Sequence, residues 1–151
     1  MAKIDPREGP YLHGDIQEEW IISEAMKQKV ICSTKSDKVI LFVDDVFINL
    51  RMMGNLLNSM GIAFHMASSG EQAVEMCSKF KHEMIFLDYF MVGITGLEAS
   101  EKIRNDDMNK ETPIIILTAN EYDEDIKNSG LGYIQKPINK HRLDEIINKS
   151  Q

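Results

Sequence analysis

Five polar side chains stand at the points where hydrophobic runs of the sequence end, and their types suit the chemistry of a phosphoryl group. They are Asp44 and Asp45 after residues 39–43, Asp88 after 84–87, Thr118 after 114–117, and Lys136 after 133–135. In an open parallel sheet, ligands bind in the crevice beyond the carboxyl ends of the strands. We therefore expect these side chains to converge on one acidic site that also carries a hydroxyl and an ammonium group.

A cluster of carboxylates at neutral pH needs a cation, because like charges a few ångströms apart raise one another's pKa unless something neutralises them. Oxygen ligands on a rigid frame suit Mg²⁺, which keeps several waters and binds one or two carboxylates plus a phosphate oxygen. The set predicts phosphoryl transfer with an aspartate as nucleophile. The metal and Lys136 would neutralise charge on the incoming group, and Thr118 would hydrogen-bond to it.

The composition limits the classes of protein to which the chain can belong. A net charge of -7 over 151 residues leaves no basic face for nucleic acid. Cys32 and Cys77 are too few for a disulfide framework, and Cys77 shares the apolar side of a predicted helix with Ala73 and Val74, so we expect a reduced, packed thiol. No stretch has the length and hydropathy of a membrane span or signal peptide, so we expect a cytoplasmic protein without membrane contact.

From Lys38 onward, short β-branched runs alternate with helical periods, which is typical of a doubly wound parallel sheet. We expect strands at 39–43, 63–67, 84–87, 114–117 and 132–135. We expect helices at 47–60, 71–80, 97–104 and 139–148, with room for only about two turns within 121–129. This order favours an α/β fold of the flavodoxin-like class, with five strands in the order 2-1-3-4-5, five helices and a shortened fourth helix.

From Lys38 to about Asn148 these residues resemble the receiver domains of two-component response regulators. The positions that carry the resemblance are the acidic pair Asp44–Asp45, the phosphoacceptor Asp88, the glycine Gly96, the hydroxyl residue Thr118 with Ala119, the aromatic Tyr133, and the pair Lys136–Pro137. The specificity lies in the set, because all of these residues occur in order at predicted strand ends. A lone strand-end aspartate is usually only a cap or turn residue.

The resemblance implies a role for each matching residue. Asp45 and Asp88 would bind Mg²⁺ directly with the backbone carbonyl of Phe90, while Asp44 would act mostly through water. Asp88 would take a phosphoryl group from a histidine kinase or a histidine phosphotransfer protein, and Lys136 and Thr118 would hold its oxygens. Such a protein catalyses its own phosphorylation and hydrolysis and is not a conventional enzyme.

The resemblance also implies a conformational response. As Thr118 moves toward the phosphoryl group, Tyr133 would swing inward and shift a population that already exists. The Lys136–Pro137 peptide bond is expected to be cis.

Three departures from the family pattern have structural consequences. Val92 stands where the family usually has proline, so the loop after Asp88 loses a fixed φ and is expected to be more mobile. The spacing from Thr118 to Lys136 is about one helical turn short, which predicts the curtailed fourth helix. Phe90 is apolar where many relatives have a polar residue that helps to orient water, which predicts a longer-lived acyl phosphate.

Residues 1–37 form an extension to the receiver pattern, which occupies 38–151. Asp15 and Glu18 resemble a capping pair that opens a helix at about 15–31. Its apolar stripe indicates a docking or dimerising helix, and the alternative is a mobile leader or a helix that only covers the receiver. His65, His82 and His141 show no ligand spacing, so we expect surface positions. We expect a stand-alone receiver, either a monomer or a weak homodimer, with features of hybrid-kinase receivers.

Three alternatives compete with the receiver interpretation. A degenerate receiver that acts as a phosphorylation-independent scaffold stays open, although every chemical residue is present. An aspartyl-nucleophile phosphatase of the haloacid dehalogenase type requires a second aspartate two residues after the first, where this chain has Phe90. A flavodoxin needs a phosphate-binding loop after the first strand, where Asp44 and Asp45 would repel that phosphate.

Overall fold

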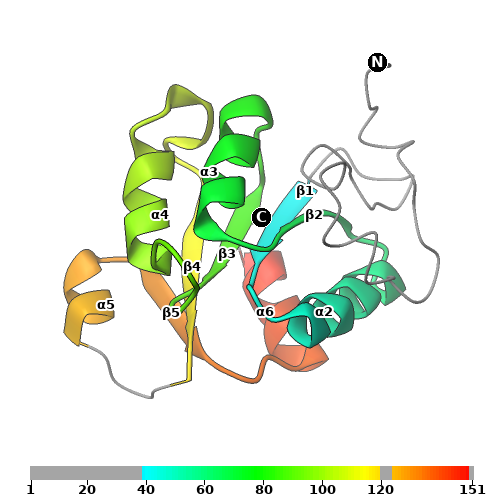
Figure 1. Ribbon diagram of the computed structural model, residues 1–151. Coiled ribbons are helices and arrows are strands. Elements are labelled where there is room, and N and C mark those ends of the chain that lie inside the picture. Colours follow the sequence, from blue (N-terminus) through cyan, green and yellow to red (C-terminus); the bar gives the residue numbers. More distant parts are fainter. Residues whose placement is uncertain (1–38, 120–123, 150–151) are drawn as a thin grey trace.

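The computed structural model describes residues 39–119 and 124–149. The helix expected at about 15–31, together with Cys32, lies outside the described residues. The described part is built around one sheet, and its helices lie on both faces of that sheet (Figure 1).

The sheet has five parallel strands in the order β2-β1-β3-β4-β5, as the sequence predicted. The strands are β1 (Val39–Val43), β2 (Ala63–Ala67), β3 (Met84–Asp88), β4 (Ile114–Thr118) and β5 (Gly132–Gln135). Two predicted strands were one residue too short, because β3 includes Asp88 and β4 includes Thr118. Both functional candidates therefore belong to the hydrogen-bonded sheet itself.

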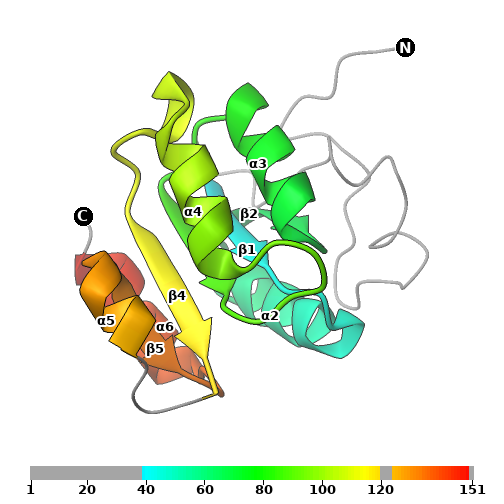
Figure 2. The ribbon, with the colours of Figure 1, turned by 60° about the vertical axis from the view of Figure 1, so that its left-hand side comes forward.

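Helices α3 and α4 cover one face of the sheet, and α2 and α6 cover the other (Figure 2). The α-helices are α2 (Phe47–Ser59), α3 (Gly70–Lys79), α4 (Gly96–Arg104), α5 (Glu124–Ser129) and α6 (Lys140–Lys149). Helix α5 has 6 residues, in agreement with the predicted shortening. A 3₁₀ helix, η2 (Asp107–Asn109), was not predicted.

The continuous apolar character of the strands follows from this layering. Every residue of β1, β2 and β3 is buried, because a parallel sheet covered on both faces leaves no polar side. Leu41 and Val43 pack toward α3 and α4, whereas Ile40 and Phe42 pack toward α2 and α6. Burying one such side chain stabilises the folded state by about 1.5–3 kcal/mol. Because the strands are fixed in this way, the start of each loop that follows them is fixed as well.

Helix α4 begins with a capping box that fixes the end of the loop after Asp88. The Thr95 side chain accepts from the Glu98 amide, and the Glu98 side chain accepts from the Thr95 amide. This arrangement satisfies two amide groups that a helix start otherwise leaves unpaired. Within 39–119 and 124–149, no helix has the length and apolar character that a bilayer crossing requires.

The surface positions predicted for His65 and His82 are wrong. Both side chains are buried, and His65 Nδ1 lies 2.7 Å from His82 Nε2. The prediction failed because every side chain of β2 is buried, so the usual alternation that marks a buried face is missing. His141, in contrast, is exposed as predicted.

The buried histidine pair is part of a polar cluster with Cys77 and Asn109. Cys77 Sγ lies 3.9 Å from His82 Nδ1, and the His82 backbone amide donates to Asn109 Oδ1 at 2.8 Å. Asn109 Nδ2 donates to the carbonyl of Cys77 at 2.7 Å and thereby connects η2 to α3. Burial raises the pKa of the Cys77 thiol to about 12, and the predicted packing of this side chain in the core is confirmed.

The histidine pair predicts a loss of stability in acid. Burial lowers the pKa of His65 and lowers that of His82 from 6.5 to about 4. The unfolded chain therefore binds protons below about pH 6.5 that the folded protein excludes. We expect the free energy of unfolding to have its full value above that pH and to fall by on the order of 3 kcal/mol as the pH is lowered toward 4. Urea unfolding at a series of pH values measures this. His82→Gln should flatten this dependence and exposed His141→Gln should not; equal pH dependence in both variants contradicts the assignment.

Candidate functional site

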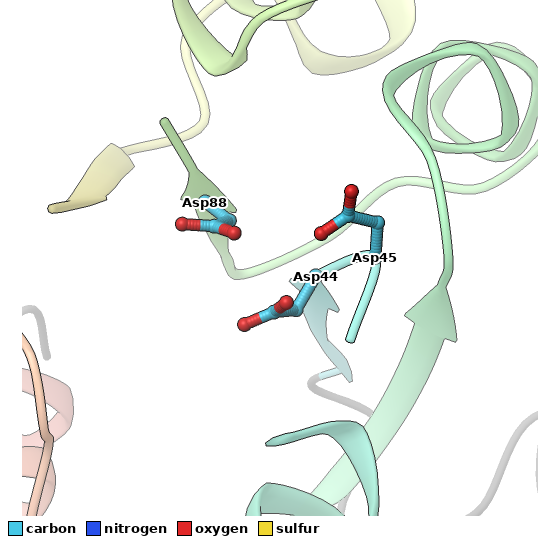
Figure 3. Close-up of side chains that lie close together, drawn as sticks. All are labelled: Asp44, Asp45 and Asp88. Carbon is cyan, nitrogen blue, oxygen red and sulfur yellow. The ribbon is translucent and has the colours of Figure 1, made fainter. Parts of the chain in front are cut away.

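The carboxyl ends of β1 and β3 bring three carboxylates together. Asp44 and Asp45 follow β1 directly, and Asp88 is the last residue of β3. Ligand oxygens of all three lie within 4.8 Å of one another, and the side chains turn toward a shared space (Figure 3). The convergence of the acidic residues is therefore as the sequence predicted.

Lys136, directly after β5, reaches across the sheet ends to two of these carboxylates. Its Nζ lies 2.8 Å from Asp88 Oδ1 and 3.2 Å from Asp44 Oδ2. The Asp44 and Asp88 side chains are 0% and 8% exposed, whereas that of Lys136 is 26% exposed. The ammonium group therefore neutralises part of a buried negative charge and still has contact with solvent.

This environment changes the pKa values of the two central groups. The pKa of Asp88 is raised to about 6, chiefly by burial and in smaller part by Asp44 and Asp45, with the Lys136 hydrogen bond and charge opposing the rise. Burial alone would lower the pKa of Lys136, but its contacts with Asp88 and Asp44 raise it overall. Asp88 is thus more basic than an ordinary aspartate and still mostly ionised at pH 7, which suits a nucleophile.

Asp44 is held by several groups besides Lys136. The Val46 amide donates to Asp44 Oδ1 at 2.9 Å, and Asn49 Nδ2 donates to Asp44 Oδ2 at 3.0 Å. Asn49 lies in the first turn of α2, so the start of that helix helps to fix the carboxylate. Because both of its oxygens already have partners, Asp44 is poorly placed to bind a metal ion directly.

Asp45 has a different environment, because it is only half-buried. Its Oδ2 accepts a hydrogen bond of 2.9 Å from the backbone amide of Val92, in the loop between β3 and α4. This contact joins the loop after β1 to the loop after β3 across the mouth of the site.

The loop between β3 and α4 is anchored at Met91 and at Gly96. Met91 is buried in the core between the sheet and α3/α4. Gly93 has φ of 92°, and a Cβ there would lie 2.8 Å from Glu71 Oε2. A Cβ on Gly96 would lie 2.5 Å from the Asp88 carbonyl oxygen, so only glycine permits this close approach. These contacts oppose the greater mobility that the absence of proline at position 92 predicted.

The other predicted site residues have defined places around the carboxylates. Thr118 is buried at the end of β4, and its carbonyl accepts from the Lys136 amide at 2.7 Å. The Lys136–Pro137 peptide bond is cis. Phe90 and Tyr133 are 64% and 40% exposed, so both aromatic side chains face solvent to a large extent.

The donor set fits a hard divalent cation. Three carboxylates supply oxygen atoms at close range, and Asp45 and Asp88 have fewer direct partners than Asp44. Oxygen-only ligands that leave several coordination positions to water or phosphate suit Mg²⁺. Sequence reasoning missed two contributors, the contact of Asn49 with Asp44 and the Val92 amide. The Val92 amide could not have been found from the sequence, because a backbone donor carries no signature in its side chain.

Comparisons with known proteins place these features in a family. The family model described as "Response regulator receiver domain" matches residues 40–148. The chain is 30% identical over 118 residues to the signal transduction histidine-protein kinase BarA of Shigella flexneri. The aligned region covers 76% of this chain but only 13% of that protein. The chain thus spans a small part of the length of this curated relative.

Solved structures give the same result. The receiver domain of sensor histidine kinase PA1611 from Pseudomonas aeruginosa, with a magnesium ion coordinated in its active-site cleft, has a TM-score of 0.70 and 27% identity over 76% of this chain and 97% of its own. The receiver domain of Ssk1 in complex with the histidine phosphotransfer protein Ypd1, from Saccharomyces cerevisiae, has a TM-score of 0.67 and 26% identity over 74% of this chain and 87% of its own.

The ion pairs of Lys136 predict a specific stability effect. Lys136→Met should lower the free energy of unfolding by roughly 1–3 kcal/mol at pH 8 with a chelator, because Asp44 and Asp88 then lack a cation. Urea unfolding with and without Mg²⁺ measures this, and the metal should recover part of the loss. Exposed Lys81→Met is the control and should change stability by less than about 0.5 kcal/mol. An equal loss in both variants would show that Lys136 does not offset the buried charge.

Proposed function

Because the chain belongs to the response regulator receiver domain family, we propose that it accepts a phosphoryl group on Asp88 from a phosphohistidine. The donor is a histidine kinase or a histidine phosphotransfer protein. One observation carries this proposal: Lys136 Nζ bridges Asp88 and Asp44, with Asp45 completing a cluster whose oxygens lie within 4.8 Å. That arrangement combines a nucleophile, a fixed cation and oxygen ligands for a second cation.

The transfer is a displacement at phosphorus. An oxygen of Asp88 forms the new P–O bond while the P–N bond to the donor histidine breaks, and the imidazole leaves with the bonding pair and takes up a proton. Lys136, at 2.8 Å from Asp88 in the resting state, is placed to pair with the phosphoryl oxygens instead. Thr118, buried at the end of β4, would supply a hydroxyl to the phosphoryl oxygens.

Asp45 and Asp88, with the backbone carbonyl of Phe90, would hold Mg²⁺, and Asp44 would contribute through water. The bound ion would neutralise charge on the phosphoryl oxygens and orient them for the displacement. The PA1611 receiver domain, with its magnesium ion in the corresponding kind of cleft, supports this assignment.

Phosphorylation would act on the surface near β5 through Thr118 and Tyr133. Tyr133 pairs in register with Ile116 on β4, two residues before Thr118 in the chain. Its side chain is exposed, so an inward movement would change what a partner contacts. The output is a contact with another protein or transfer of the phosphoryl group to it. The cytoplasmic location of the protein stays a prediction.

An apolar surface beside the site supports a protein donor. Val46, Ile48, Met52, Phe90 and Val92 are 45–83% exposed, and Ile48 and Met52 lie one turn apart on α2. A hollow of about 300 Å³ lies next to them, lined by side chains that include Met52, Met53 and Leu56 as well as Asp44 and Lys136. A phosphotransfer protein could place apolar side chains here and its phosphohistidine at Asp88, and the Ypd1–Ssk1 complex supports such pairing.

The first prediction tests the nucleophile against the scaffold alternative. With Mg²⁺ and acetyl phosphate, the protein should gain one phosphoryl group that hydroxylamine removes, as seen by intact mass. Asp88→Asn should abolish the gain, whereas exposed Asp107→Asn should leave it unchanged. A wild-type protein that takes up no phosphoryl group supports the scaffold, and labelled Asp88→Asn refutes the assignment of the nucleophile.

The second prediction separates the two neighbouring aspartates. Asp45→Ala should weaken Mg²⁺ binding by about tenfold or more, whereas Asp44→Asn should have a smaller effect, because direct ligation outweighs a water-mediated contact. Isothermal calorimetry measures both dissociation constants. Equal constants for the two variants would contradict the proposed division of roles.

The third prediction concerns the partner surface. Replacing both Ile48 and Met52 with serine should slow phosphotransfer from a histidine phosphotransfer protein by about tenfold or more, because two central apolar contacts are lost. Labelling by acetyl phosphate should not change, since that donor needs no protein surface. Met108→Ser, on the distant η2, is the control; a similar slowing in that variant would place the docking surface elsewhere.

A further inference from the structure

We propose that the backbone amide of Val92 is a positioning group for the magnesium ligand Asp45. The inference rests on the proposed metal site and adds a residue to it. Its basis is the hydrogen bond of 2.9 Å from the Val92 amide to Asp45 Oδ2, which joins the loops that follow β1 and β3.

Asp45 is the least constrained of the three carboxylates. Asp44 accepts from Val46 and Asn49 and pairs with Lys136, and Asp88 pairs with Lys136. In the part of the chain that the structure describes, the Val92 amide is the one hydrogen-bond partner of the Asp45 carboxylate. The orientation of this half-buried side chain therefore depends on a single backbone donor.

The donor itself is held firmly. Its neighbour Met91 is buried in the core, and Ile94, two residues after Val92, packs against the same core and lies against Gly70 at the start of α3. The side chain of Val92 is 83% exposed and takes no part in this anchoring. The position therefore contributes its amide to the site, and the amide is fixed by the residues on either side.

A carboxylate that accepts through one oxygen can still bind a cation through the other. The Val92 amide occupies Oδ2, which leaves Oδ1 for the metal and removes one rotational freedom that binding would otherwise have to restrict. The same contact fixes the loop that carries the Phe90 carbonyl, the proposed third protein ligand. Groups that orient metal ligands typically contribute tenfold to a hundredfold in metal affinity.

Proline at position 92 tests this directly, because proline has no backbone N–H. Val92→Pro should raise the dissociation constant for Mg²⁺ by about tenfold, as measured by isothermal calorimetry, whereas Val92→Ala keeps the amide and should match the wild type. Equal constants for Val92→Pro and Val92→Ala overturn the inference alone. A wild-type protein that binds no Mg²⁺ contradicts the proposed function itself.

Amide hydrogen exchange tests the inference without a proline variant, so it applies even where Val92→Pro does not fold. The Val92 amide should be protected in the wild type, should stay protected when Mg²⁺ is added, and should exchange faster in Asp45→Ala. Exchange that Asp45→Ala does not accelerate would show that the hydrogen bond is not formed in solution. Loss of protection on adding Mg²⁺ would show that the amide competes with the metal, which also overturns the inference.

Discussion

The site depends on the balance between three carboxylates and one ammonium group at the carboxyl ends of a buried sheet. Asp44 and Asp88 have almost no contact with water, so their repulsion is offset by Lys136 and by the hydrogen bonds that Asp44 accepts from Val46 and Asn49. The folded state thus keeps an unfavourable concentration of charge. A divalent cation bound among the three carboxylates, as proposed above, would relieve this repulsion, which gives the site a physical reason to bind one.

The sheet was predictable from the sequence for a physical reason. Covered on both faces, its strands need continuous apolar runs, and such runs are the clearest local pattern that a short strand can have. The same layering caused the error at His65, because a strand with both faces buried gives no alternation from which the burial of one polar residue can be read. The buried pair with His82 depends on a loop that meets β2 only in the folded chain.

The side chains of the site were predictable because they sit at strand ends, where position follows from the fold class. The contacts between them were less so. Asn49 reaches Asp44 because the start of α2 turns back over the end of β1, and Thr112, Asn109 and His82 meet through η2, an element without a strong sequence pattern. Short 3₁₀ turns are set by neighbouring contacts more than by their own residues.

Val92 shows how one sequence difference has two physical meanings. The absence of proline removes a fixed φ, which by itself predicts a looser loop. The same absence supplies an amide hydrogen, and the folded chain directs it at Asp45. Since the loop is already anchored by Met91 and Ile94, the lost restriction on φ matters less than the gained hydrogen bond. The contribution of a residue to this site is therefore decided by the backbone geometry around it, which only the folded structure provides.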